Sequence, residues 1–242
     1  MVLTLGWMID MKISIKRDNT FVEYELQDTD TTLLKILDEI KETMDNTLTY
    51  NSGCKSNVCG SCGVRVNEKE VLACGYKVKD GDKVEPLKNL EVIRDLVVDM
   101  DKAYEFNKKA KAWQNKHSHN ISLTHEDEKI NEVQSDCILC GSCFSACPVY
   151  AVNEEFLGPF SLTRVWRYVS DKRESGEKAK IDNIQTNGIW DCTLCNECTL
   201  VCPQGISSKA DIEKLRMKSA QYGYIDPNFA SFGGGFDGGL GF

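Results

Sequence analysis

The amino-acid sequence predicts an α+β fold, with a small N-terminal β-grasp domain followed by an α-helical domain. Apolar residues alternate with polar ones in several short runs early in the chain, whereas those of the second half recur at helical spacing. The 242 residues suffice for two domains of ordinary size. We expect the first domain at residues 11–103, the second at 104–225, and a tail rich in glycine and phenylalanine at 226–242.

The elements of the first domain are predicted from local patterns. Thr31 or Thr32 can cap a helix over residues 33–40, where the apolar positions follow helical spacing. Turn-forming residues occupy 18–20 and 67–70 and separate the alternating runs. We expect four such runs to form strands, at residues 11–16, 22–26, 64–66 and 71–72. Hairpins around one helix are typical of a β-grasp domain.

The second half contains an internal repeat. The run DCILC at residues 136–140 recurs as DCTLC at residues 191–195, and the later cysteines and prolines align as well. The polar stretch 117–131 is expected to be a loop. Apolar residues at helical spacing predict three helices, within residues 95–113, 162–169 and 212–217.

Charge and composition exclude two classes of function. The formal net charge is −8, so a nucleic-acid role has no electrostatic support. No apolar run approaches the ~18 residues that span a bilayer. The apolar residues 1–9 lack the basic region and the cleavage site of a signal peptide. We therefore expect no nucleic acid as a partner and no direct membrane insertion, so that any membrane association requires a partner subunit.

All twelve cysteines fall into three groups of four. The first group has the C-x4-C-x2-C spacing of plant-type [2Fe–2S] ferredoxins, with a fourth cysteine further on. The other two have the C-x2-C-x2-C-x3-C spacing, followed by proline, of bacterial two-cluster ferredoxins. The groups are Cys54, Cys59, Cys62 and Cys74, then Cys137, Cys140, Cys143 and Cys147, then Cys192, Cys195, Cys198 and Cys202. Three such groups predict a chain that carries electrons.

In paired runs of this kind the fourth cysteine binds the cluster of the other run. We therefore predict one [2Fe–2S] and two [4Fe–4S] clusters, with iron held by these cysteines alone. The predicted ligand sets are Cys54, Cys59, Cys62 and Cys74 for the [2Fe–2S] cluster, Cys137, Cys140, Cys143 and Cys202 for one [4Fe–4S] cluster, and Cys192, Cys195, Cys198 and Cys147 for the other.

Two alternatives use the same cysteines. Four cysteines can bind a structural zinc ion, although zinc sites seldom show three close cysteines followed by a fourth and proline. Disulfides are disfavoured because the chain shows no secretory signal. His117, His119 and His125 lie in a polar stretch and are expected to be solvated. No catalytic residue is predicted, because no serine–histidine–aspartate or paired-carboxylate arrangement stands out, so substrate chemistry is expected on a partner.

The order of a [2Fe–2S] domain before a two-cluster domain resembles the iron–sulfur subunit of succinate dehydrogenases and fumarate reductases. The supporting stretches are residues 50–62 (YNSGCKSNVCGSC), 72–74, 92–99 (VIRDLVVD), 137–150 and 157–159. In that family the subunit links an FAD-containing flavoprotein, which interconverts succinate and fumarate, to a quinone-reacting third subunit at the membrane. The resemblance implies that electrons run from FAD through the clusters of Cys54, Cys137 and Cys192 in turn. Fumarate reduction reverses this order and is slightly favoured.

Two departures from the family pattern set this chain apart. Usual members lack a cysteine at the position of Cys195 and carry a [3Fe–4S] third cluster. Cys195 here implies a [4Fe–4S] cluster, or a [3Fe–4S] cluster if this cysteine does not bind. A tryptophan and a histidine of the usual quinone pocket are replaced by Val152 and Thr193. The resemblance therefore points to the branch with a cysteine-rich third subunit like heterodisulfide reductase, supplied by a methylated menaquinol or a thiol.

Two other functions stay open. A thiol-driven fumarate reductase subunit would use the same clusters, and a free-standing multi-cluster carrier resembling ferredoxins would belong to no complex. The expected location is the cytoplasm, at the membrane through a partner subunit. The alternative is the periplasm, reached by export together with a flavoprotein that carries a twin-arginine signal. The tail at 227–242 is interpreted as a disordered end or as a docking strap with phenylalanine anchors.

Overall fold

The first domain is built on a five-stranded sheet in the order β2-β1-β5-β3-β4. β1 (Asp10–Arg17) and β2 (Thr20–Gln27) form an antiparallel hairpin, as do β3 (Gly63–Val66) and β4 (Lys69–Leu72). The alternating runs therefore predicted all four strands. β5 (Lys83–Glu85) joins the two hairpins, parallel to β1 and antiparallel to β3. No sequence pattern predicted this strand, because three residues are too few to show alternation.

The predicted helix of this domain is α1 (Leu33–Thr43), and it buries an apolar stripe in the sheet core. Thr32 occupies the N-cap position, but its side chain makes no capping hydrogen bond. The amides of Leu33 and Leu34 instead donate to the carbonyl groups of Tyr76 and Ala73. These backbone carbonyls satisfy donors that a free helix end would leave unpaired.

The connection to the second domain differs from the prediction of one helix over residues 95–113. β6 (Val92–Arg94) and β7 (Val97–Val98) form a small hairpin, and α2 (Asp101–Lys109) begins only after it. Asp95 lies in the turn with a left-handed φ of 46°. Its buried carboxylate accepts hydrogen bonds from the Arg17 side chain and from the amide of Thr49. These long-range contacts favour the turn over a helix start.

The second domain is helical, and its two longest helices, α6 and α9, pack against each other. They contain the stretches 162–169 and 212–217 that predicted them, although Met217 is exposed rather than buried. A capping box of Thr124 and Asp127 starts a short helix within the stretch expected to be a loop. The helices are α3 (His125–Lys129), α4 (Glu132–Ser135), α5 (Ser142–Ser145), α6 (Pro159–Val169), α7 (Glu177–Asn183), α8 (Glu197–Leu200), α9 (Ser208–Gln221) and α10 (Pro227–Ala230).

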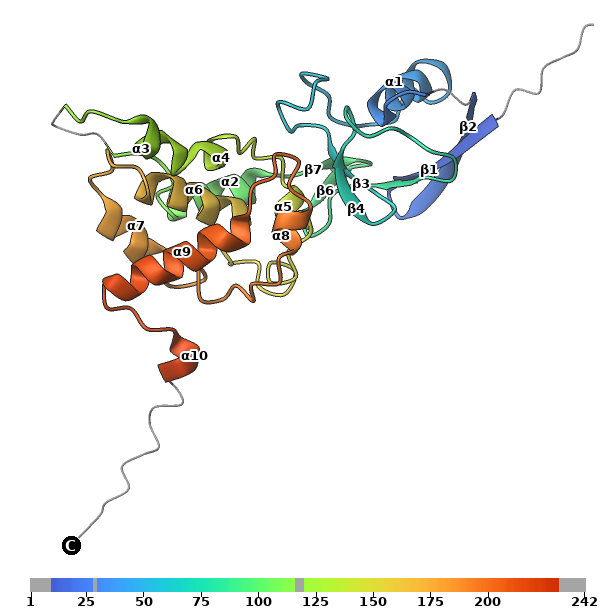
Figure 1. Ribbon diagram of the computed structural model, residues 1–242. Coiled ribbons are helices and arrows are strands. Elements are labelled where there is room, and N and C mark those ends of the chain that lie inside the picture. Colours follow the sequence, from blue (N-terminus) through green and yellow to red (C-terminus); the bar gives the residue numbers. More distant parts are fainter. Residues whose placement is uncertain (1–9, 28–29, 116–119, 231–242) are drawn as a thin grey trace, which may run out of the picture.

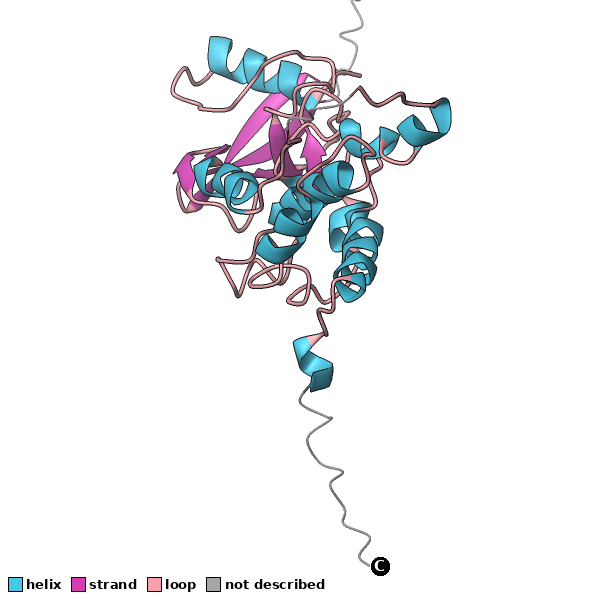
Figure 2. Cartoon of the chain, turned by 90° about the vertical axis from the view of Figure 1, so that its left-hand side faces the viewer, coloured by secondary structure: helices cyan, strands magenta, loops and turns pink. Residues whose placement is uncertain are grey.

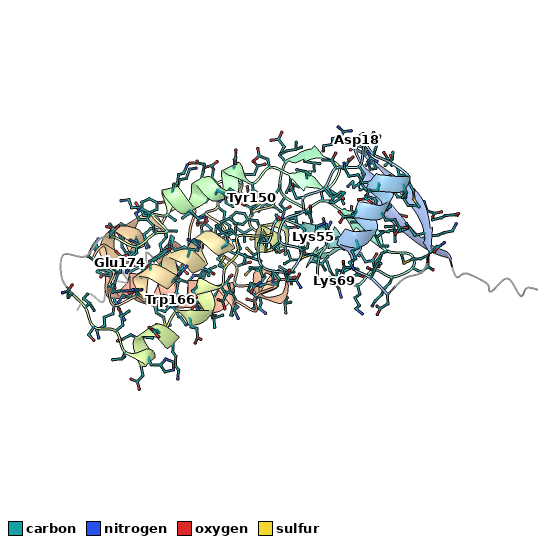
Figure 3. The ribbon with its side chains drawn as sticks, turned by 90° about the horizontal axis from the view of Figure 1, so that it is seen from above. Asp18, Lys55, Lys69, Tyr150, Trp166 and Glu174 are labelled. Carbon is teal, nitrogen blue, oxygen red and sulfur yellow. The ribbon has the colours of Figure 1, made fainter. Side chains whose placement is uncertain are left out.

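The computed structural model describes residues 10–27, 30–115 and 120–230. It confirms the predicted α+β class, with the strands gathered in one part of the molecule and most helices in the other (Figures 1 and 2). Seen from above, Asp18 lies near one end of the molecule and Glu174 near the other (Figure 3). Residues 1–9, the histidines at 117 and 119, and residues 231–242 lie outside the described part, and the domain boundaries stay predictions.

The two domains meet through a small set of hydrogen bonds. The side-chain amide of Asn89 donates to the carbonyl groups of Phe144, Ser145 and Cys147 at 2.9–3.2 Å. The Ser145 hydroxyl accepts from the amide of Lys88 at 2.8 Å and donates to the Glu70 carboxylate at 2.7 Å. The second group of cysteines is therefore held against the sheet domain. Within the described residues, no helix is long and apolar enough to cross a membrane.

Candidate iron–sulfur centres

Three cysteines of the first group lie in a loop whose backbone amides point at sulfur, and the fourth, Cys74, follows β4. Three amides, those of Ser56, Val58 and Cys59, donate to the Cys54 sulfur at 3.2–3.4 Å. The amide of Cys54 donates in turn to the Cys59 sulfur at 3.3 Å, and that of Asn57 donates to Cys74. Lys55 and Asn57 both have a left-handed φ of 59°, which turns successive amides inward.

The four thiols of this loop differ in environment. The hydrogen bond from the Cys54 amide, with further bonds from Ser61, lowers the pKa of Cys59 to about 6. Burial instead raises the pKa of Cys62 to about 11. The sulfur atoms of Cys62 and Cys74 lie 3.3 Å apart. The loop thus brings all four predicted ligands together, two exposed and two buried.

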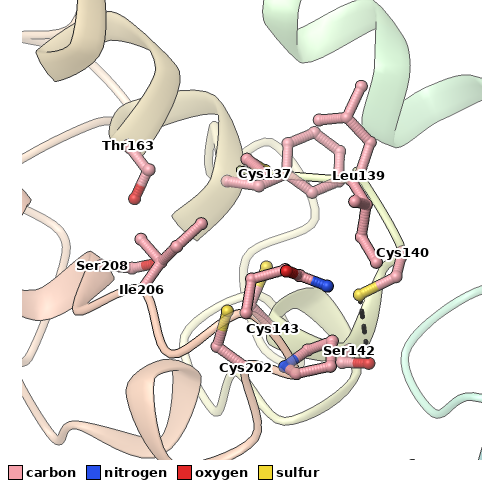
Figure 4. A pocket seen from close by; sticks show the side chains of 13 residues that line it. Cys137, Leu139, Cys140, Ser142, Cys143, Thr163, Cys202, Ile206 and Ser208 are labelled. Atoms are coloured by element: carbon pink, nitrogen blue, oxygen red, sulfur yellow. Dashed lines mark hydrogen bonds between the residues drawn. The ribbon is translucent and has the colours of Figure 1, made fainter. Parts of the chain in front are cut away.

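The second group shares a cavity with a cysteine from the third group. Cys137, Cys140 and Cys143 line it together with Cys202, as Figure 4 shows. The rest of the lining is apolar or carries neutral polar side chains, from Leu139, Phe160, Thr163 and others. Burial raises the pKa of Cys143 well above its ordinary value.

The third group has the reciprocal arrangement. Cys192, Cys195 and Cys198 line a second cavity together with Cys147. The amide of Leu194 donates to the Cys192 sulfur, and the amide of Tyr150 donates to the Cys147 sulfur, both at 3.4 Å. Burial raises the pKa of Cys198 to about 12, while Cys195 is exposed.

The internal repeat is also visible in the backbone. Leu139 and Leu194, which stand at equivalent positions, have left-handed φ angles of 55° and 56°. Gly141 and Asn196 have φ angles of 82° and 74°, and each precedes a one-turn helix, α5 or α8. The same local path thus places three cysteines around each cavity.

These cavities fit iron–sulfur clusters by the chemistry of their donors. Each is walled by four cysteine sulfurs, and no histidine or carboxylate is among the residues that line either one. Because burial raises the pKa of most of these thiols, they ionise readily only beside the positive charge of a metal. Among the described residues, no three histidine, cysteine, aspartate or glutamate side chains lie close enough to hold a single metal ion. His125 is exposed and lies away from the cysteine groups.

The first and second groups are brought into contact by a glycine. Gly60 has a φ of 73°, and a Cβ added there would lie 2.8 Å from the Cβ of Cys140 and 3.0 Å from the Ile138 carbonyl oxygen. A hydrogen bond of 3.2 Å from the Gln204 side chain to the Asn57 carbonyl joins the first loop also to the segment after Cys202. The sequence does not predict Gly60, Gln204 or Asn57 as contact residues, because no local pattern marks contacts across 147 positions.

The two positions that the resemblance singles out, Val152 and Thr193, are both exposed. Val152 is 86% exposed on the segment after Cys147. Thr193 lines an open groove with Trp190 and Arg216, and the Arg216 guanidinium donates to the Cys192 carbonyl at 2.6 Å. Neither position carries the aromatic or imidazole group that the resemblance would require for the usual pocket.

Two family descriptions cover most of the described chain. Residues 11–105 match the family described as "2Fe-2S iron-sulfur cluster binding domain". Residues 133–206 match the family described as "4Fe-4S dicluster domain". The first match covers the sheet domain and the Cys54 loop, and the second covers both later groups of cysteines.

Among curated proteins, the chain is similar to subunits of larger enzymes. It is 36% identical over 207 residues to the 8-methylmenaquinol:fumarate reductase iron-sulfur subunit of Wolinella succinogenes, over 79% of this chain and 65% of that protein. It is 35% identical over 232 residues to the fumarate reductase iron-sulfur subunit of Escherichia coli O6:H1, over 88% of this chain and 95% of that one. A chain of the solved structure titled "Mycobacterium smegmatis Sdh1 complex in the apo form" matches with a TM-score of 0.80 at 23% identity, over 91% of this chain and 99% of that chain, which shows a shared fold.

Proposed function

The chain belongs to the family of iron–sulfur subunits of succinate dehydrogenases and fumarate reductases, and from this premise we propose that it passes electrons between two partner subunits. One is an FAD-containing flavoprotein that interconverts succinate and fumarate, and the other reacts with a quinone or quinol. Substrate chemistry then lies on the flavoprotein. Fumarate reduction is the direction we favour, since both relatives described above are named as fumarate reductase subunits.

The observation that carries this proposal is the exchange of one cysteine between two cavities. Cys202 stands with the second group and Cys147 with the third. This is the arrangement in which two clusters share crossed ligands, and bound clusters of this kind accept and return single electrons. We propose Cys54, Cys59, Cys62 and Cys74 as [2Fe–2S] ligands, Cys137, Cys140, Cys143 and Cys202 as ligands of one [4Fe–4S] cluster, and Cys147, Cys192, Cys195 and Cys198 as ligands of the other.

The residues around the first group are suited to holding thiolates. Backbone amides donate to the sulfurs of Cys54, Cys59 and Cys74. Such donors stabilise negative charge on sulfur and raise the reduction potential of a bound cluster. The exposure of Cys54 and Cys59 leaves this loop accessible to a flavoprotein.

The iron content tests the ligand sets. The native protein should hold about ten iron atoms per chain, and the Cys195→Ser variant about nine, because one corner of the third centre loses its thiolate. The variant should also gain the electron paramagnetic resonance (EPR) signal of a [3Fe–4S] cluster. Cys198→Ser serves as the comparison. Cys198 is buried in the same cavity, and this variant should lose the whole third centre. An unchanged iron count and spectrum in Cys195→Ser would refute this assignment.

For the third subunit, we propose a cysteine-rich protein in place of the usual quinone-binding anchor. The support is the replacement of both pocket positions, Val152 and Thr193, and the similarity to a subunit named for 8-methylmenaquinol. The donor is then a methylated menaquinol, with a thiol as the alternative. Purified complex should reduce fumarate with one of these donors and not with the other.

A free-standing carrier is the competing function. Purification of the tagged chain from its native cells separates the two, because a subunit should bring a flavoprotein in a fixed ratio. A chain recovered alone, brown and reducible, would favour the carrier. We propose the cytoplasmic face of the membrane as its location, and the periplasm if the flavoprotein carries a twin-arginine signal. Protease accessibility of the complex in intact spheroplasts decides between the two faces.

A further inference from the structure

Three polar side chains form a buried group beside the cavity of Cys137. They are Gln134 of α4, Thr163 of α6 and Asp211 of α9, with exposed fractions of 7%, 1% and 1%. A carboxyl group in such a place is costly in its ionised form unless partners compensate the charge. Packing alone does not explain a carboxyl group here, since apolar side chains occupy most of the surrounding core.

The compensation around Asp211 is incomplete. Gln134 donates from Nε2 to Asp211 Oδ1 at 2.8 Å. Asp211 Oδ2 and the hydroxyl of Thr163 are both buried, and neither makes a hydrogen bond of standard geometry among the described residues. The Thr163 hydroxyl is nevertheless close enough to lower the pKa of Asp211, against the larger effect of burial. A proton on Oδ2 would turn that atom into a donor beside this hydroxyl.

Few charges face this carboxyl group. On its own helix, the Lys214 ammonium lies 3.9 Å from Oδ1 and is 41% exposed. The neighbours from α4 and α6 are the neutral side chains of Gln134 and Thr163, while Arg164 of α6 acts on Cys137 instead. A charge placed in the Cys137 cavity can therefore change the protonation of Asp211.

The cavity side is where the second group of cysteines lies. Thr163 lines the cavity together with Cys137, Cys143 and Cys202. Figure 4 shows Thr163 and Ser208 together at one wall, with Ser142 on the opposite side. Thr163 therefore links the two places, since it lines the cavity where a cluster would be held and also acts on the Asp211 carboxyl group.

We propose that Asp211 binds a proton when the centre held by the second group gains an electron, and releases it when the electron leaves. This rests on the proposed electron-carrying function. The electron comes from the neighbouring iron–sulfur centre. The proton comes from water on the exposed side of α9 near Lys214 and converts the carboxylate to a neutral carboxyl group. One negative and one positive charge arrive together, so the net charge of this region is unchanged.

The physical reason is the interaction of two nearby negative charges in a region of low dielectric constant. Burial already raises the pKa of Asp211 to about 6. An added electron in the cavity disfavours the carboxylate further, so protonation becomes favourable near neutral pH. By thermodynamic reciprocity, the bound proton strengthens the binding of the electron by the same factor.

The test is a potentiometric titration of the iron-loaded protein, monitored by EPR. The titration is repeated at several pH values between about pH 5 and pH 8. The midpoint potential of the centre in the Cys137 cavity should fall as the pH rises, and Asp211→Asn should flatten that dependence. The matched control is Asp182→Asn, which removes a carboxylate that is 40% exposed on α7 and should leave the dependence unchanged.

A pH-independent potential in the native protein overturns the proposal, as does an unchanged slope in Asp211→Asn. A second measurement needs no variant. The infrared difference between reduced and oxidised native protein should contain a carboxyl C=O band that shifts in heavy water, and its absence also overturns the proposal. Failure of the proposed electron-carrying function gives a result distinct from both of these, because a protein without clusters has no EPR signal to titrate.

Discussion

Replacing Gly60 with alanine should force apart the loops that carry the first and second groups of cysteines. The new Cβ would lie 2.8 Å from the Cβ of Cys140 and 3.0 Å from the carbonyl oxygen of Ile138. Side-chain Cβ atoms essentially never come under 3.0 Å, and the neighbours are a Cβ and a backbone carbonyl rather than the end of a flexible side chain. The loops must therefore move. The left-handed φ of 73° adds a second, independent cost.

The two costs can be separated with matched variants. A side chain at a left-handed position costs ~1–2 kcal/mol, and overpacking costs ~1–3 kcal/mol, so Gly60→Ala should lose ~2–5 kcal/mol. Gly81→Ala has a φ of 80° and nothing within 4 Å, so only the backbone cost applies. Gly63 has no left-handed φ, and its added Cβ meets the Cys140 carbonyl oxygen at 3.0 Å, so Gly63→Ala shows the packing cost alone.

These losses are measured by unfolding the iron-loaded proteins in urea. Circular dichroism and visible absorbance monitor the unfolding. The midpoint should fall most for Gly60→Ala and less for each of the other two variants. EPR should also show weaker magnetic coupling between the first two centres in Gly60→Ala and not in Gly81→Ala. If Gly60→Ala and Gly81→Ala lost equal stability and showed equal magnetic coupling, the reasoning would be refuted. Contact of residue 60 with Cys140 would then not determine the distance between the first two centres.

Two further predictions concern buried charges. Lys180 and Glu174 form an ion pair at 3.1 Å with both side chains 1% exposed, so Lys180→Met should lower the free energy of unfolding by ~3–5 kcal/mol by stranding the carboxylate. Thermal melting measures this, and Lys180→Met with Glu174→Gln, which removes the charge but keeps an acceptor for the amides of Asn115 and Gly176, should recover most of the loss; no recovery would contradict the reasoning. Burial raises the pKa of Asp211 from 3.8 to about 6 in the folded protein, so its ionisation weakens the fold as the pH rises through that interval. Asp211→Asn should therefore be more stable than the native protein by up to ~3 kcal/mol above pH 6 and no more stable at pH 4, and a pH-independent difference would contradict the sign.

Local patterns predicted the elements whose side chains repeat over several residues. The runs at 11–16 and 22–26 became β1 and β2, and helical spacing at 162–169 marked α6. The prediction of a helix from residue 95 was wrong. There the Asp95 carboxylate accepts a hydrogen bond from Arg17, 78 residues away in the sequence, and the chain turns back as a hairpin. Sequence periodicity reports which face of an element is buried, but not which distant side chain competes for a turn.

The sequence by itself predicted the iron–sulfur chemistry, because the proposed ligands of each centre come mostly from short runs with two to four residues between cysteines. That spacing is a property of the loop and needs no knowledge of the rest of the chain. Only the tertiary structure brought Gly60 against Cys140 and placed Asp211 beside Gln134, 77 residues away. Such contacts arise when separate elements pack into one core, and their distances and charges depend on how the helices and the sheet are stacked. Packing therefore decides how far apart the groups of cysteines lie and how readily the buried Asp211 carboxyl group binds a proton.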